Sequence, residues 1–130
     1  MARKTSRHPT ELELEILKVL WDLGSASVRD VRDALASFRD LAYTSVMTTL
    51  NIMVKKGYAK RRKQGASYTY RPLVNREATT GGMLADMVDR VFDGSAAAAV
   101  LHLIETGDLD ESELRELRAL IRRKEKGQDS

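Results

Sequence analysis

The sequence predicts a mainly helical fold with one small β-hairpin, in which an N-terminal winged helix-turn-helix precedes a C-terminal dimerisation region of three helices. Three observations support this prediction. Apolar residues recur at helical spacing along most of the chain, one basic stretch near residue 60 alternates as a hairpin does, and the net charge changes sign between the two halves. We therefore expect one domain at residues 1–74 and a second at residues 75–130.

The first helix is expected to begin after Thr10 and to end at Gly24. Thr10 and Glu13 have the spacing of a capping box, in which each side chain accepts a hydrogen bond from a backbone N–H at the start of the helix. A broad apolar face follows, made by Leu12, Ile16, Leu17, Val19, Leu20 and Leu23. After a connector at residues 25–27 with room for one brief strand, Ser27 caps a short second helix whose apolar residues are Val28, Val31, Ala34 and Leu35.

The third helix is expected from Tyr43 to Lys56, with a stop at Gly57. Its apolar stripe consists of Val46, Leu50, Met53 and Val54. Residues 58–64 and 67–71 alternate on either side of a turn at Gly65, which predicts a β-hairpin that ends at Pro72. Three helices followed by a basic hairpin are the layout of a winged helix-turn-helix.

The second half is expected to be helical throughout, with breaks at Gly94 and before a capping pair at Asp110 and Glu113. Three short helices with few aromatic residues bury little surface on their own, so we expect them to close against a second copy of the chain. The predicted dimerisation residues are Met83, Leu84, Met87, Val88, Val91, Leu101, Ile104, Leu114, Leu117 and Ile121. The alternative is that these helices pack back onto the first domain.

The charge distribution points to a polyanionic partner for the first half. The formal net charge of the chain is +3, but residues 1–74 carry 14 Lys and Arg against 7 Asp and Glu, whereas residues 75–130 carry 8 against 12. Residues 41–76 contain no acidic residue. This asymmetry favours nucleic acid, although two ordinarily solvated surfaces would also produce it.

The third helix carries the residues expected to contact DNA. At 100° per residue, the face opposite its apolar stripe holds Thr44, Thr48, Asn51 and Lys55, with Ser45 on one flank. Short uncharged hydrogen-bonding groups can approach base edges and phosphates in a groove. They cost helix propensity, and the alternative is that the hydroxyls bond only to their own backbone.

The hairpin supplies the positive charge beside that helix. We expect three or four of its basic residues to reach phosphates, from the set Lys60, Arg61, Arg62, Lys63 and Arg71. Tyr68 and Tyr70 alternate with these charges and are expected to pack within the wing. Arg3, Lys4 and Arg7 would add at most a weak phosphate or minor-groove contact.

Several functional classes are excluded by composition. The chain has no cysteine, so thiolate metal sites, disulfides and cysteine catalysis are excluded. His8 and His102 are its only histidines, and neither has a partner at catalytic or metal-binding spacing. We expect no enzyme activity, no cofactor and no metal. No apolar run is long enough to span a bilayer, and a cytoplasmic location is expected.

The order of motifs resembles the BlaI/MecI family of bacterial penicillinase repressors, from about Thr10 to Ile121. The segments that carry the resemblance are residues 14–21 (LEILKVLW), 43–50 (YTSVMTTL), 55–57 (KKG) and 68–72 (YTYRP). It implies a homodimeric repressor that binds an inverted repeat, often of TACA/TGTA type, through the third helix. By that match the residues facing DNA are Thr44, Ser45, Thr48, Thr49 and Lys55, and Ile52 stands where many members have Arg.

The resemblance also bears on induction. Copper-responsive relatives carry a C-terminal cysteine cluster, which is absent here. β-Lactam-responsive relatives are cleaved by a membrane-bound sensor-protease at an Asn-Phe bond, which aligns with His102-Leu103. This departure from the Asn-Phe pair argues against inactivation by that protease. The alternative function is a winged-helix interaction module that docks an acidic protein.

Overall fold

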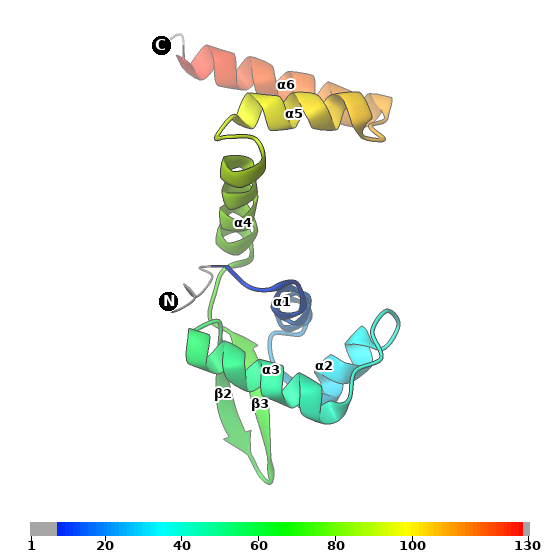
Figure 1. Ribbon diagram of the computed structural model, residues 1–130, viewed down its shortest axis with the longest axis vertical. Helices are drawn as coiled ribbons and strands as arrows, with labels where there is room; N and C mark the ends of the chain where they lie inside the picture. Colours follow the sequence, from blue (N-terminus) through cyan, green and yellow to red (C-terminus); the bar gives the residue numbers. More distant parts are fainter. Residues whose placement is uncertain (1–7, 129–130) are drawn as a thin grey trace. The chain divides into compact units, whose positions relative to one another are not determined.

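The computed structural model describes residues 8–128, so Arg3, Lys4 and Arg7 lie outside the described residues. Its elements are α1 (Glu11–Leu23), β1 (Ala26–Ser27), α2 (Val28–Leu35), α3 (Tyr43–Lys56), β2 (Ala59–Gln64), β3 (Ser67–Pro72), α4 (Arg76–Val91), α5 (Ala96–Thr106) and α6 (Glu111–Gln128) (Figure 1). The chain divides into two compact units at residues 1–85 and 86–130, inside α4. The predicted functional boundary at residues 74 and 75 lies just before α4 and stays a proposal.

The helix ends of the first unit follow the local signals in the sequence. Thr10 and Glu13 form the expected capping box on α1, and Ser27 forms a second one with Asp30 on α2. Gly57 ends α3 in the left-handed conformation with φ of 84°, which side chains disfavour. The predicted limits of α1 and α3 are therefore confirmed.

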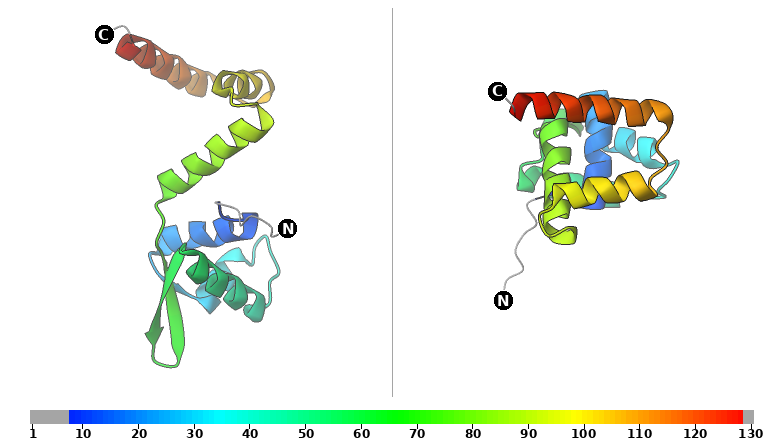
Figure 2. Two further views of the ribbon diagram at one scale, coloured as in Figure 1. Left: turned by 60° about the vertical axis from the view of Figure 1, so that its left-hand side comes forward. Right: turned by 90° about the horizontal axis from the view of Figure 1, so that it is seen from above.

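A three-stranded antiparallel sheet in the order β1-β3-β2 packs with α1, α2 and α3 in the first unit. The hairpin β2–β3 extends past the helices in two views of the molecule (Figures 1 and 2). The core is formed by Ile16, Leu17, Leu20, Ala26, Val28, Val31, Leu35, Val46, Leu50, Met53, Ala59 and Tyr70. Leu23, predicted on the apolar face of α1, is exposed because the helix ends there.

The segment that follows β3 is held against α1 by two side-chain hydrogen bonds. The Trp21 indole Nε1–H donates a hydrogen bond of 2.9 Å to the carbonyl oxygen of Val74. The Arg76 guanidinium donates to the Asp22 carboxylate at 2.9 Å and lies over the Trp21 ring. The first residue of α4 is therefore held against the end of α1.

The second unit has almost no interior of its own. Its helices α5 and α6 contain a single buried residue, Ala99, among those described. Large apolar side chains of α5 remain exposed, namely Val100, Leu101, Leu103 and Ile104. Within residues 8–128, no helix is both long enough and apolar enough to cross a lipid bilayer.

Candidate nucleic-acid interface

Helix α3 presents a polar face to solvent because its opposite face is fixed in the core. Val46, Leu50 and Met53 are completely buried among the other core residues. Thr44, Ser45, Thr48 and Lys55 are exposed, as helical periodicity predicts. The face they form offers hydroxyl groups and one ammonium group, with no carboxylate.

The start of α3 has free backbone donors. Ala42 is its N-cap residue and supplies no side-chain hydrogen bond, in contrast to Thr10 on α1 and Ser27 on α2. The first backbone N–H groups of a helix lack partners within the helix and carry a partial positive charge. An approaching phosphate would meet these donors directly.

Thr49 and Asn51 lie differently from the exposed residues of α3. The Thr49 hydroxyl donates a hydrogen bond of 2.9 Å to the carbonyl oxygen of Ser45, and Thr49 is half-buried. Asn51 is half-buried as well, because its side chain contacts the hairpin. Its predicted place opposite the core is thus corrected: the wing folds against that side of α3.

The Asn51 side-chain carbonyl links α3 to both strands of the wing. Its Oδ1 accepts a hydrogen bond from the Tyr70 hydroxyl at 2.9 Å and another from the Arg61 guanidinium at 3.2 Å. Burial raises the pKa of the Tyr70 phenol, and the positive charge of Arg61 opposes that rise in part. Tyr70 therefore stays a neutral donor. Helical periodicity could not reveal this contact, since it depends on how the hairpin folds back.

The register of the hairpin sorts its basic residues onto two faces. Arg61 lies opposite Tyr70 and Lys63 opposite Tyr68, so these four share the face from which Tyr70 and Arg61 reach Asn51. Lys60, Arg62 and Arg71 belong to the other face by this register. An open concavity of about 420 Å³ on the wing is lined by these three residues together with Ser25, Thr69 and Arg61.

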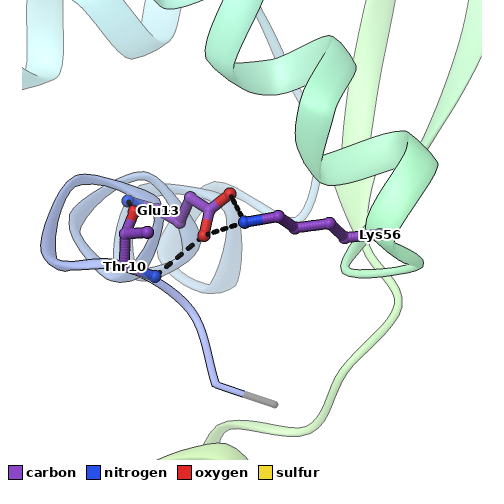
Figure 3. A network of polar contacts seen from close by, with 3 residues as sticks. All are labelled: Thr10, Glu13 and Lys56. Carbon is purple, nitrogen blue, oxygen red and sulfur yellow. Dashed lines mark hydrogen bonds and ion pairs between the residues drawn. The ribbon is translucent and has the colours of Figure 1, made fainter. Parts of the chain in front are cut away.

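Most of these basic side chains are not neutralised. Among residues 8–128, no ion pair engages Lys55, Lys60, Arg62, Lys63 or Arg71. Lys56 differs, because its ammonium group lies 3.0 Å from the buried carboxylate of Glu13 (Figure 3). Of the two lysines at the end of α3, Lys55, which the helical wheel predicted to face DNA, has no acidic partner in the described part of the chain.

The predicted dimerisation residues lie on α4, α5 and α6. Leu84, Met87, Val91, Leu101, Ile104 and Ile121 are exposed, while Met83, Val88, Leu114 and Leu117 are half-buried. None of the ten is fully buried within the chain. In the described part of the chain, no group of three or more His, Asp or Glu side chains is placed to bind a metal ion.

Comparisons with known proteins agree with this geometry. The family model described as penicillinase repressor matches residues 9–123. A transcriptional regulator BlaI of Mycobacterium tuberculosis is 33% identical over 105 residues, which cover 79% of this chain and 76% of that protein. The methicillin resistance regulatory protein MecI of Staphylococcus aureus is 24% identical over 112 residues, which cover 86% of this chain and 91% of that protein.

A solved structure resembles the fold over most of the chain. The apo form of MarR from Escherichia coli matches with a TM-score of 0.52 and 15% sequence identity, covering 88% of this chain and 76% of that one. At this identity the likeness concerns the fold alone.

Proposed function

The chain belongs to the penicillinase repressor family, and from that premise we propose that it is a dimeric DNA-binding transcriptional repressor. It binds an inverted-repeat operator, with α3 in the major groove and the wing on the flanking phosphates. Like the curated relatives, which are named as regulators, it is not an enzyme. It acts in the cytoplasm, where a bacterial chromosome lies.

The observation that carries this proposal is the combination of a carboxylate-free α3 face with unpaired cations around it. Thr44, Ser45 and Thr48 are exposed on a helix held rigidly by three fully buried residues. Lys55 lies on that face and the basic residues of the wing lie on the neighbouring hairpin, and among residues 8–128 none of Lys55, Lys60, Arg62, Lys63 and Arg71 has an acidic partner. Hydroxyls read base edges and methyl groups, while lysine and arginine bind phosphates.

Dimerisation is proposed because the second unit has no core of its own. The exposed apolar residues of α5 would leave a large unfavourable contact with water in a monomer. Closing them against a second copy removes that surface. A two-fold symmetric pair places its two α3 helices about 34 Å apart, one turn of B-DNA, as an inverted repeat requires.

Repression then follows from occupancy of the promoter by the bound dimer. A dimer bound across a promoter blocks it sterically and needs no catalytic group. The TACA/TGTA half-sites implied by the family are the proposed target. The bond aligned with the family's cleavage site, His102-Leu103, lies inside α5.

Selection from random DNA tests this function without assuming an operator. The purified full-length protein is mixed with a pool of random duplexes, and the bound fraction is sequenced over several rounds. We expect enrichment of an inverted repeat whose half-sites are centred one helical turn apart. Failure to enrich any duplex would contradict the repressor proposal and favour an acidic protein as the partner of the basic surface.

A further inference from the structure

We propose that Asn51 is a positioning residue that holds Arg61 in the orientation in which the wing contacts DNA. This inference rests on the proposed function. Asn51 was expected to contact DNA itself, as one of the polar residues of α3. Its carbonyl oxygen instead binds two donors from the wing, so its contribution to DNA binding passes through Arg61.

The orientation of the Asn51 amide is fixed by its partners. The Tyr70 hydroxyl and the Arg61 guanidinium both approach as donors, at 2.9 and 3.2 Å, so the oxygen must face the wing. Tyr70 is 1% exposed and cannot turn its hydroxyl to water without leaving the core. Asn51 therefore has a rigid neighbour on one side and Arg61 on the other.

Arg61 is held by a second contact as well. Its guanidinium carbon lies over the Tyr68 ring, 4.6 Å from the ring centroid, which is a cation–π contact. One amino group of Arg61 donates to Asn51, and its remaining N–H donors make no hydrogen bond to the described residues. Arg61 is nonetheless exposed, so these donors are open to a phosphate or a base edge.

Arg62 provides a matched comparison on the neighbouring position of β2. It belongs to the opposite face of the hairpin, and its side chain has no hydrogen bond, ion pair or ring contact among the described residues. A free arginine must lose rotamer freedom on binding, which costs about two- to tenfold in affinity for each side chain that is ordered. Arg61 avoids most of this loss because Asn51 and Tyr68 order it beforehand.

If Asn51 acts through Arg61, the effects of substituting these two residues on operator affinity should not be additive. Asn51→Ala is expected to weaken operator binding about fivefold by releasing Arg61. In an Arg61→Ala background the same substitution should have little further effect, since nothing remains to be oriented. In an Arg62→Ala background it should keep its full effect, because Arg62 does not touch Asn51.

A purely structural role for Asn51 predicts a different result. Tyr70→Phe removes the other hydrogen bond of Asn51 but leaves its bond to Arg61. It should lower the stability of the fold while changing operator affinity less than twofold. If the effect of Asn51→Ala reflected lost stability alone, the two variants would lose affinity in proportion to their urea midpoints.

The test is a double-mutant cycle on full-length protein, read by fluorescence anisotropy at one salt concentration on the selected operator and on a scrambled duplex. Wild-type binding is measured first: no preference for the operator would overturn the proposed function and this inference with it. Given that preference, a non-additivity of about fivefold for Asn51 with Arg61, and none with Arg62, is the expected result. Additive effects for both pairs would overturn the positioning role alone.

A measurement on the unmutated protein guards against variants that fail to fold. Heteronuclear relaxation of the arginine Nε–H groups reports side-chain order on the ps–ns timescale. Arg61 should be as ordered as the backbone of the wing, and Arg62 should be mobile. Equal mobility of the two side chains would overturn the proposal.

Discussion

Lys56, the last residue of α3, is paired with Glu13 in the first turn of α1. The Lys56 Nζ lies 3.1 and 3.0 Å from the two carboxylate oxygens of Glu13, which is 2% exposed (Figure 3). Glu13 Oε1 also accepts a hydrogen bond of 2.8 Å from the Thr10 backbone N–H. One buried carboxylate thus caps α1 and fixes the end of the helix proposed to read DNA.

Breaking this pair from the lysine side should destabilise the fold. Lys56→Met leaves the buried Glu13 charge with only the Thr10 N–H, which we expect to cost about 2–4 kcal/mol in the free energy of unfolding. Glu13→Gln combined with Lys56→Met should restore more than half of that loss, because no unpaired charge remains. Urea denaturation gives the values. Lys55→Met is the matched control, and a loss equal to that of Lys56→Met would refute the role of the pair.

In DNA binding, substitution of Lys55 should have an effect on the salt dependence of affinity and substitution of Lys56 should have none. Lys55 is exposed and has no ion-pair partner in the described part of the chain, so Lys55→Met should reduce the slope of log K against log salt concentration by about 0.9 for one lost phosphate contact. Lys56→Met should leave that slope unchanged wherever the variant remains folded. Anisotropy titrations at four salt concentrations measure it. A slope that falls for Lys56 and not for Lys55 would reverse the assignment.

Substitutions of Thr48 and Thr49 test whether α3 recognises the DNA sequence. The exposed Thr48 hydroxyl is available to DNA, so Thr48→Ala should reduce the ratio of operator to scrambled affinity about fivefold while nonspecific affinity changes little. The Thr49 hydroxyl is already bonded to Ser45, and Thr49→Ala should change the ratio less. Equal losses on both duplexes for Thr48→Ala would show that this side chain carries no sequence information.

Leu101 tests the dimer with little disturbance of the protomer. It is 59% exposed in the single chain, so Leu101→Asp should not disturb the protomer's own packing. In the proposed dimer it would bury an unpaired charge and raise the dissociation constant at least about 100-fold. Sedimentation equilibrium measures the change. Ser112→Asp, in the first turn of α6, is the control and should stay dimeric; a fully dimeric Leu101→Asp would place the interface elsewhere.

Local signals in the sequence were sufficient for most of the first unit. Thr10, Ser27 and Gly57 bound their helices as expected because caps act over three or four residues. The Gly65 turn likewise set the register of the hairpin. The mainly helical fold, the family and the small sheet are confirmed.

Contacts between segments that are distant in the sequence could not be predicted from such local signals. Glu13 was expected only as a cap, and its pairing with Lys56 depends on how α1 and α3 pack. Asn51 appeared on the polar side of a helical wheel, which contains no information about the wing that covers it. Both side chains are polar and half or fully buried, so each needed a partner that periodicity alone does not identify.

The central claim is sequence-specific DNA binding, and fluorescence anisotropy tests it most directly. The purified protein is titrated onto a duplex bearing a TACA/TGTA inverted repeat and onto the same duplex scrambled, at one stated salt concentration. The account predicts a preference of about 10³ or more for the repeat. Equal, weak binding to both duplexes would contradict it.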